Sequence, residues 1–203
     1  MRDSRFDDLV PLFHLNQKRL YIVGGSTRDL LLNREYTDHD FVTDATPEEM
    51  KHFLIEANYT FSRFGSVRLK IKGEEVDITT LREEGEYLDY RHPSYIRFIK
   101  DLYKDSLRRD FTINAIYLDE EYKIIDYHNG LIDLKKHMIR FIGDPIKRIE
   151  EDPLRILRAE RFAEKLHFEL EANTKKAIAM KRYLLDELNP AKIAEEERKR
   201  KEK

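Results

Sequence analysis

The feature that most restricts the fold of this chain is a diglycine turn between a short apolar run and a helical stretch. Residues 21–23 are aromatic or β-branched, and Gly24 and Gly25 permit a tight turn with close backbone approach. A helical pattern resumes over residues 27–32. Because a helix N-terminus beside glycine amides attracts phosphate, this stretch predicts a strand, turn and helix that cradle a phosphate group.

A pair of aspartates follows this turn after about a dozen residues. Asp38 and Asp40 flank His39, and alternate residues of a strand point to the same side of a sheet. Two such carboxylates can hold Mg²⁺ for nucleotidyl transfer, although an isolated pair of aspartates is also typical of a solvated turn. The same alternation predicts that His39 faces outward and does not bind metal.

A third carboxylate, Asp77, lies in a later strand pattern over residues 75–79. It alternates with Val76 and Ile78, so it faces away from the core side of that strand. Beside the aspartate pair it would help to bind the metal or accept the proton of an attacking hydroxyl. The alternative is a strand residue that faces water, and the spacing alone leaves both open.

Composition is consistent with a folded protein of the cytoplasm. The chain has 203 residues, of which 40% are hydrophobic, enough to build the core of one average domain. It has no cysteine, no apolar run long enough to cross a membrane and no signal-peptide pattern, so a cytoplasmic protein without membrane contact is expected. The net charge of −2 neither favours nor excludes RNA.

The patterns of secondary structure divide the chain into two parts. Up to about residue 126, short β-like runs alternate with helical stretches such as residues 47–56, which indicates an α+β domain on one small mixed sheet. The strand patterns lie over residues 20–23, 40–42, 66–71, 75–79 and 123–126. We expect a first domain over residues 1–130 and a helical one over residues 131–203.

The second part reads as successive helices. They are expected over residues 145–150, 153–166, 171–180 and from 190 onward, with one strand pattern over residues 138–141. Several of these helices begin with proline, which fits the first helical turn. Residues 191–203 are almost entirely charged, which predicts a solvated or fraying helix end.

Four motifs of this chain resemble, in order and spacing, those of class II tRNA nucleotidyltransferases (CCA-adding enzymes) and bacterial poly(A) polymerases. They are Gly24-Gly-Ser-Thr-Arg-Asp29, Asp38-His-Asp40, Arg108-Arg-Asp-Phe-Thr-Ile-Asn-Ala115, and the segment from Glu151 to Phe162. The resemblance runs from about residue 20 to about residue 168, and residues 85–93 look like the flexible loop of that family. It implies a polymerase β-like nucleotidyltransferase head followed by an all-helical neck.

The resemblance also implies roles for individual residues. Asp38 and Asp40 match the Mg²⁺ ligands, and the residues that match contacts to the nucleotide are Gly24, Gly25, Arg28, Arg109, Asp152, Arg155, Arg158 and Arg161. Within that set, Gly25 and Arg28 correspond to the triphosphate, and Asp152 and Arg155 to the pair that reads the base. The implied substrates are CTP, ATP and the 3′ end of tRNA, and no protein partner is indicated.

The pair Asp152 and Arg155 has the chemistry to select C and A. Cytosine and adenine present an amino donor beside a ring-nitrogen acceptor, which a carboxylate and a guanidinium complement. The two residues lie three apart on an expected helix and share a face. From the helix alone, Asp152 would cap amides before Pro153 and Arg155 would form a surface ion pair; the match of four motifs favours base recognition.

Other motif residues also have structural alternatives. Arg109 could pair with Asp110 or a nearby glutamate, and Arg161, flanked by Glu160 and Glu164, is the arginine whose role is most easily structural. Asn114 is expected to tie down a backbone turn, while its apolar neighbours Phe111, Ile113 and Ala115 pack in the core.

The chain departs from the family in length. The helical body and tail domains that hold tRNA have no recognisable counterpart after about residue 185, so the sequence fits either a head-and-neck fragment or a natural short form. This leaves tight tRNA binding in question.

Three activities remain compatible with these motifs. The first is Mg²⁺-dependent addition of C and A to the tRNA 3′ end, which the loop around residues 89–91 favours. The second is a poly(A) polymerase or an enzyme that adds only C or only A. The third, from another class, is a nucleotide- or RNA-binding module without catalysis, against which three intact carboxylates argue.

Overall fold

The computed structural model describes residues 2–36, 38–87 and 93–201. The chain folds as two units. The first comprises residues 1–83, 96–108 and 114–127, and the second comprises residues 84–95, 109–113 and 128–203. The main division thus falls three residues before the expected one at residue 130, and two short segments of the predicted head, 84–95 and 109–113, group with the helical unit. The division into functional domains stays a prediction.

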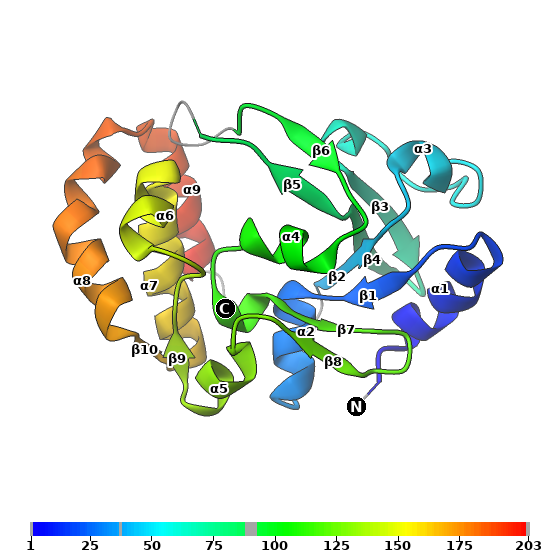
Figure 1. Cartoon of the computed structure of the whole chain (residues 1–203), viewed down its shortest axis with the longest axis horizontal. Coiled ribbons are helices and arrows are strands. Elements are labelled where there is room, and N and C mark those ends of the chain that lie inside the picture. Colours follow the sequence, from blue (N-terminus) through cyan, green and yellow to red (C-terminus); the bar gives the residue numbers. More distant parts are fainter. Residues whose placement is uncertain (1, 37, 88–92, 202–203) are drawn as a thin grey trace. The chain divides into compact units, whose positions relative to one another are not determined.

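The first unit is built on a six-stranded sheet in the order β3-β4-β2-β1-β7-β8 (Figure 1). Its strands are β1 (Leu20–Ile22), β2 (His39–Thr43), β3 (Ser66–Ile71), β4 (Glu74–Thr80), β7 (Ile116–Leu118) and β8 (Ile124–Asp126). Strands β2 and β4 run parallel, and the other four neighbouring pairs are antiparallel. The predicted α+β class with a small mixed sheet is confirmed.

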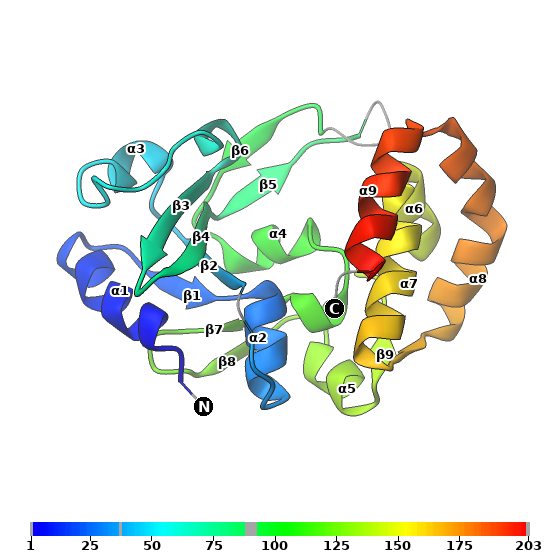
Figure 2. The ribbon, with the colours of Figure 1, turned by 180° about the vertical axis from the view of Figure 1, so that it is seen from behind.

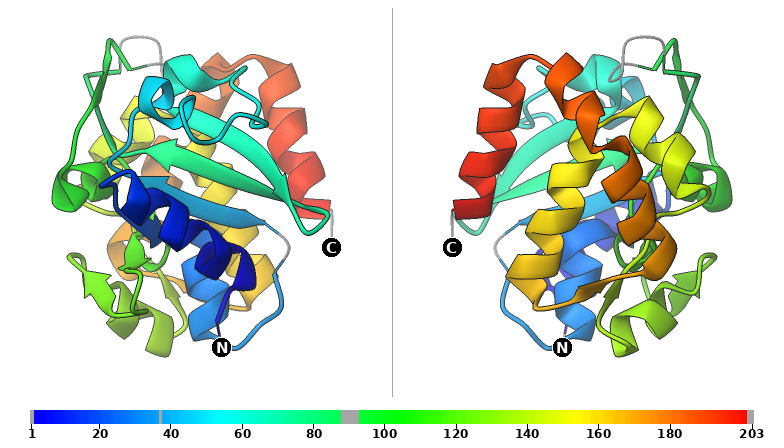
Figure 3. Two further views of the ribbon diagram at one scale, coloured as in Figure 1. Left: turned by 90° about the vertical axis from the view of Figure 1, so that its right-hand side faces the viewer. Right: turned by 90° about the vertical axis from the view of Figure 1, so that its left-hand side faces the viewer.

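The two faces of this sheet bury different clusters. Phe41 and Ile78 belong to one core cluster, together with Phe6 and Phe13 of helix α1 (Ser4–Leu15), which is dark blue in Figure 3. Val42 belongs to a second cluster that includes Tyr21, Val23, Leu81 and Tyr117. Because side chains alternate along a strand, residues 40 and 77 lie on the face away from α1.

The remaining elements of the first unit are short. They are α2 (Gly24–Leu31), α3 (Pro47–Met50), α4 (Leu102–Leu107), β6 (Ile96–Phe98) and the 3₁₀ turns η1 (Ser62–Phe64) and η2 (Thr112–Asn114), with β5 (Arg82–Glu84) and η2 each straddling the division. The helix expected over residues 47–56 is wrong beyond Met50. There the amides of His52 and Phe53 bond three residues back, in turns that bring Leu54 into the core.

The second unit consists mainly of helices, which Figure 2 shows from behind. They are α5 (Gly130–Lys135), α6 (Pro145–Glu151), α7 (Leu154–Leu166), α8 (Ala172–Lys181), η3 (Arg182–Glu187) and α9 (Pro190–Lys201). The expectation of an all-helical second part needs one correction, since β9 (Met138–Ile139) and β10 (Glu169–Leu170) form a parallel pair. The strand pattern expected over residues 138–141 contains β9, whereas no strand was expected at β10.

The charged C-terminal helix is largely exposed, as expected, but it also makes specific contacts. Glu196 of α9 is 9% exposed and forms an ion pair with Arg161 of α7, and Arg200 pairs with Glu164. Helix α9 therefore packs on α7 through alternating charges. In the described ranges, no helix has the length and apolar character needed to cross a membrane.

Candidate functional site

The diglycine turn brings the backbone against one of the predicted carboxylates. Gly24 begins α2 with φ +71°, and the amide of Val23 donates to the carbonyl of Asp40 over 3.1 Å. A Cβ atom built on Gly24 would lie 3.2 Å from Oδ2 of Asp40. Glycine is therefore required here both for the left-handed conformation and for the approach to the carboxylate.

The start of α2 is suited to an anion. Val23 occupies the N-cap position, and its apolar side chain cannot cap the first amides of the helix. The guanidinium of Arg28 lies over Gly25, with Nη2 3.5 Å from the Cβ position of that glycine. Asp29 binds Nε and Nη2 of Arg28, and Oδ1 of Asn114 accepts from Nη1 over 2.9 Å.

The aspartate pair is positioned around the first residue of β2. Asp38 precedes the strand and is exposed, whereas Asp40 lies within it and is half-buried. The hydroxyl of Ser26 donates to the carbonyl of Asp38 over 2.7 Å and accepts from the amide of Asp40 over 2.8 Å. One side chain of α2 thus binds the backbone on both sides of residue 39.

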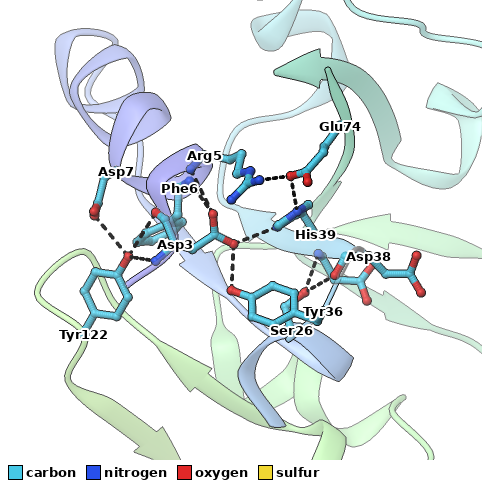
Figure 4. Close-up of polar contacts among 11 residues, drawn as sticks. Asp3, Arg5, Phe6, Asp7, Ser26, Tyr36, Asp38, His39, Glu74 and Tyr122 are labelled. Carbon is cyan, nitrogen blue, oxygen red and sulfur yellow. Dashed lines mark hydrogen bonds and ion pairs between the residues drawn. The ribbon is translucent and has the colours of Figure 1, made fainter. Parts of the chain in front are cut away.

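The expectation that His39 faces outward is wrong. Its side chain is on the core face of the sheet and the residue is 3% exposed, between Asp3 and Glu74 (Figure 4). Alternation does place His39 on the face opposite the aspartates, but both faces of this sheet are covered, so that face is the interior below α1.

Asp77 lies in register with Asp40 on the neighbouring strand and therefore on the same face. It does not simply face water. Its carboxylate accepts two hydrogen bonds from Arg68, from Nε over 2.7 Å and from Nη2 over 2.8 Å. The hydrogen bond to Asp77, and then the charges of Asp77, Glu75 and Asp38, raise the pKa of Arg68.

A cleft of about 370 Å³ opens beside these carboxylates over β3 and β4. Its lining comprises Asp40, Asn58, Phe61, Phe64, Ser66, Val67, Arg68, Asp77, Thr79 and Arg82. Phe61 is 57% exposed although its ring is apolar. Since the sheet order places β1 and β4 on opposite sides of β2, the cleft and the diglycine turn flank Asp40 from opposite sides.

The carboxylates fit a small divalent cation that shares its coordination with a substrate. Asp40 offers a hard oxygen donor beside the diglycine turn, and Asp38, two residues earlier, offers a second one. Among the described residues, no group of three His, Cys, Asp or Glu side chains converges on one metal position. Mg²⁺ is typically bound by one or two carboxylates, with water and phosphate oxygens completing the octahedron, so this donor set suits it.

In the second unit, a buried carboxylate organises the predicted arginines. Oδ1 of Asp110 accepts from Nε of Arg155 over 3.1 Å, and Oδ2 lies 2.7 Å from Nη2 of Arg158. Nη1 of Arg155 donates to Glu151 over 2.5 Å and to the carbonyl of Arg148 over 2.7 Å. Arg155 is 2% exposed, so it does not form the surface ion pair of the structural alternative.

Burial and charge act in opposite directions within this cluster. Burial disfavours ionised Asp110, but the charges of Arg158, Arg155 and Arg148 outweigh it and lower the pKa of the carboxyl. Burial, and then repulsion by Arg155, lowers the pKa of Arg148. Asp110 and Glu151 therefore supply the negative charge that allows the buried guanidinium groups of Arg148 and Arg155 to lie together.

The carboxylate of Asp152 makes a hydrogen bond to the backbone and also borders a cavity. Its Oδ1 accepts from the amide of Leu154 over 3.1 Å, which is the capping contact of the structural alternative. Burial raises the pKa of this carboxyl. Asp152 and Arg158 also line a cavity of about 240 Å³ together with residues of α9, so capping does not remove Asp152 from a space open to a ligand.

The other two predicted arginines make distinct contacts within the second unit. The carbonyl of Arg109 accepts from Nη2 of Arg148 over 2.9 Å. Arg161 lies 3.4 Å from Glu196 through Nε, and its guanidinium is 4.6 Å from the ring centre of Phe162. Its neighbours Glu160 and Glu164 pair with Arg182 and Arg200 instead.

Several residues that shape these sites have no role in the sequence-based expectations. Ser26 and Asn114 lie inside the recognised motifs, so their polar side chains were a signal, although Asn114 was expected to bond the backbone and instead holds Arg28. Arg68 could have been found from its alternation with the core residues Val67 and Leu69. Asp3 lies far from every motif and left no such signal.

Comparison with known proteins tests the resemblance directly. The model of the poly A polymerase head domain matches residues 20–140 of the chain. The chain belongs to this family. A CCA-adding enzyme of Lactobacillus helveticus is 47% identical over 87% of the chain, and one of Bacillus licheniformis is 47% identical over 81% of it. The predicted membership of the CCA-adding and poly(A) polymerase family is confirmed.

Solved structures of the family agree with the fold. The CCA-adding enzyme of Bacillus stearothermophilus in complex with CTP superposes with a TM-score of 0.89 at 32% identity, over 98% of this chain and 49% of that one. A tRNA nucleotidyltransferase complexed with a primer tRNA and an incoming ATP analog gives 0.70 at 36% identity, over 87% and 50%. The chain also spans only 44% and 42% of the two curated relatives.

Proposed function

We propose that this chain catalyses template-independent, Mg²⁺-dependent transfer of C and A residues from CTP and ATP to the 3′ end of tRNA. The observation that carries this proposal is the contact between the Gly24 turn and the carboxylate of Asp40. A backbone turn that can bind phosphate thus lies next to an oxygen that can bind a metal ion, which supports transfer of a nucleotide. The similarity to enzymes named CCA-adding supports the choice of substrates.

Asp38 and Asp40 are the proposed ligands of Mg²⁺. When bound there, the ion would neutralise triphosphate charge and lower the pKa of the attacking hydroxyl. Asp77, in register with Asp40, is the third proposed catalytic carboxylate and would accept the proton of that hydroxyl. Arg68 fixes the direction of the Asp77 carboxylate through its two hydrogen bonds.

The triphosphate is proposed to bind at the start of α2. The amides of Gly24 and Gly25 would donate to phosphate oxygens, and the partial positive charge of the helix N-terminus adds to their effect. Arg28, held by Asp29 and Asn114, would contribute a fixed positive charge over Gly25. These donors stabilise charge that grows on the leaving pyrophosphate.

The acceptor end of the RNA is proposed to enter through the cleft over β3 and β4. An in-line displacement needs the attacking hydroxyl opposite the leaving pyrophosphate. The cleft and the diglycine turn lie on opposite sides of Asp40, which supports this entry route. The exposed ring of Phe61 offers a surface on which a terminal base can stack.

The base is proposed to be selected by residues of the second unit. The carboxylate of Asp152 accepts and the guanidinium of Arg155 donates, which complements cytosine and adenine and opposes guanine and uracil. Nε and Nη1 of Arg155 are engaged by Asp110, Glu151 and a carbonyl, so Nη2 is the donor proposed for the base. Arg109, Arg158 and Arg161 remain proposed nucleotide contacts.

The cellular setting follows from the proposed substrates. Addition to tRNA would take place in the cytoplasm, where CTP and ATP are also found, and needs no membrane. The chain spans less than half of the length of the curated relatives it matches.

A second candidate is addition of A alone, since the matching family model is that of a poly A polymerase head domain. Addition of C alone and binding without catalysis are the remaining alternatives. The loop residues around position 89 that favour full C and A addition lie outside the described residues.

The deciding experiment incubates the full chain with tRNA that lacks its 3′ CCA, with Mg²⁺ and with each nucleoside triphosphate in turn. Incorporation of C and then A supports the main proposal, whereas A tails alone support poly(A) synthesis. Binding of labelled CTP without incorporation supports the module without catalysis. A full-length CCA-adding enzyme run in parallel shows that the tRNA is a competent substrate.

A further inference from the structure

The direction of Asp38 is not fixed by the sheet. Strand β2 begins at His39, which is the first residue in register with β4, so Asp38 lies before the hydrogen-bonded ladder. Its side chain is exposed and belongs to a short connecting segment. For the carboxylate of Asp38 to lie on the same face as that of Asp40, some other contact must hold residue 38 in an extended conformation.

The side chain of His39 supplies two such contacts on the interior face. Its Nδ1 lies 2.8 Å from Oδ2 of Asp3, and its Nε2 lies 3.1 Å from Oε2 of Glu74 (Figure 4). Both ring nitrogens are therefore engaged, each by a carboxylate from a different element. Side-chain exposure of 2% for His39 and 1% for Asp3 means that water cannot easily replace the Asp3 contact.

The two carboxylates that bind His39 are themselves held in place. Oδ1 of Asp3 caps α1 by accepting from the amide of Arg5 over 2.9 Å, and Oδ2 accepts from the hydroxyl of Tyr36 over 2.8 Å. The amide of Asp3 donates to the hydroxyl of Tyr122 over 2.9 Å. Glu74 forms an ion pair with Arg5, also on α1. His39 is thus joined to a helix and to strand β4.

The backbone on either side of His39 is bound by helix α2. Ser26 of α2 accepts from the amide of Asp40 and donates to the carbonyl of Asp38. Residue 39 is therefore fixed through its side chain by α1 and β4, and through its flanking peptides by α2. Rotation at this position would swing Asp38 and Asp40 apart.

We propose that His39 is a positioning residue for the metal, which holds the first residue of β2 so that Asp38 and Asp40 present their carboxylates on one face. It does not touch the metal or the substrate, because its ring points into the interior. This inference rests on the metal role proposed above for Asp38 and Asp40. It gives the N-terminal helix α1 a part in catalysis through Asp3.

The test measures binding of Mn²⁺ alone to the full chain by electron paramagnetic resonance, beside thermal unfolding of each variant. His39→Leu removes both polar contacts and is expected to weaken Mn²⁺ binding by about 10- to 100-fold, as loss of supporting contacts does at other metal sites. His39→Asn keeps a donor near the position of Nδ1 and is expected to recover a large part of that loss. His52→Leu, a change of an exposed histidine, is the matched control.

Measuring Mn²⁺ affinity and folding together distinguishes a positioning role of His39 from a role in stability alone. Unchanged Mn²⁺ affinity in folded His39→Leu overturns the inference, and so does an equal loss in the Asn and Leu variants, because the Asp3 contact would then not matter. If His39→Leu does not fold, Glu74→Ala decides. This variant changes a side chain that is 38% exposed, removes the partner of Nε2 together with the ion pair to Arg5, and leaves the contact between His39 and Asp3 in place. A weaker Mn²⁺ affinity in that folded variant supports the inference, and an unchanged one contradicts it.

Failure of the proposed function gives a different result. If Asp38→Ala and Asp40→Ala leave Mn²⁺ binding of the parent chain unchanged, the metal site itself is misassigned. If those two variants lose Mn²⁺ and the His39 variants retain it, only the positioning role is wrong.

Discussion

The two candidate sites differ in how far their charged side chains are withdrawn from water. In the sheet unit, Asp38 is exposed and Asp40 is half-buried, and Ser26 binds the backbone of both. In the helical unit, Asp110 and Arg155 are withdrawn from water and bind each other. The first site leaves its aspartates in reach of water, and the second fixes guanidinium groups before any ligand arrives.

This difference in burial fits the roles proposed for the two sites, which are metal binding in the sheet unit and base selection in the helical unit. A cation that must bind and leave with each substrate requires oxygens that exchange with water. Discrimination between bases requires donors and acceptors that do not rearrange, because a flexible group would adapt to the wrong base. The comparison predicts large catalytic and small structural effects in the sheet unit, and the reverse at Asp110.

The largest effect is expected from Asp40→Asn. The amide is a poor ligand for Mg²⁺, and loss of several kcal/mol of charge stabilisation corresponds to a decrease in kcat on the order of 10³-fold. Thermal unfolding should change little because the carboxylate is half-buried and its backbone contacts remain. Single-turnover incorporation measures the effect, with Asp8→Asn, a surface carboxylate paired with Lys72, as the control.

Asp110→Asn is expected to show the opposite balance. It leaves buried Arg155 and partly exposed Arg158 without their shared negative charge, and breaking a buried pair costs about 3 kcal/mol of unfolding free energy. Urea denaturation measures this loss, with the exposed Asp186→Asn as the matched control. A loss as small as that of the control would show that the arginine cluster is not held by Asp110.

The same variant gives a pH dependence of known sign. The pKa of Asp110 is lower in the folded chain than its ordinary value near 3.9, so its contribution is complete above that value and is lost as the pH falls toward the folded pKa. The stability difference between parent and Asp110→Asn should therefore shrink as acid is added below about pH 4. A difference that grows in acid would contradict the lowered pKa.

A smaller effect, on specificity, is expected from Asp152→Asn. Asparagine caps a helix about as well as aspartate, so the contact to the amide of Leu154 and the stability should persist. The amide can both donate and accept, so preference for CTP over UTP should fall by about 10-fold, within the 1–3 kcal/mol cost of an unpaired buried group. Competition between labelled CTP and UTP measures the ratio, and an unaltered ratio would leave Asp152 as a cap alone.

The sequence predicts best where local pattern and burial agree. The alternation of Val67 and Leu69 with polar residues predicts β3 with the bounds that the structure has, and prolines at 145 and 190 mark the start of α6 and α9. It fails at residues 51–56, where a helical composition gives way to turns because Leu54 packs into the core. Tertiary packing overrode the local preference there.

In the candidate site, too, the sequence predicts the residues of local motifs and misses the contacts between distant residues. Motif order picks out Asp38, Asp40 and the diglycine turn, because each is a local pattern with a chemical reason. The contact of His39 with Asp3 joins residues that are 36 positions apart in the sequence, and the pair of Asp110 and Arg155 joins residues that are 45 positions apart. No spacing rule connects residues at such separations. Long-range polar contacts of this kind are decided by the fold.

The smallest expected effect comes from a comparison of two glycines in the sheet unit. Gly24 and Gly73 both have positive φ, +71° and +88°, so alanine strains either one by about 1 kcal/mol. Only at Gly24 would the new Cβ meet the carboxylate of Asp40, at 3.2 Å, since Gly73 has open space around its Cβ position. Both variants should lose similar stability in denaturation, whereas only Gly24→Ala should lower kcat, by about tenfold if the shifted carboxylate costs about 1.4 kcal/mol in the transition state. An equal kcat in the two variants would mean that the close approach of the turn to Asp40 has no catalytic role. The proposed function would then lose the observation that supports it.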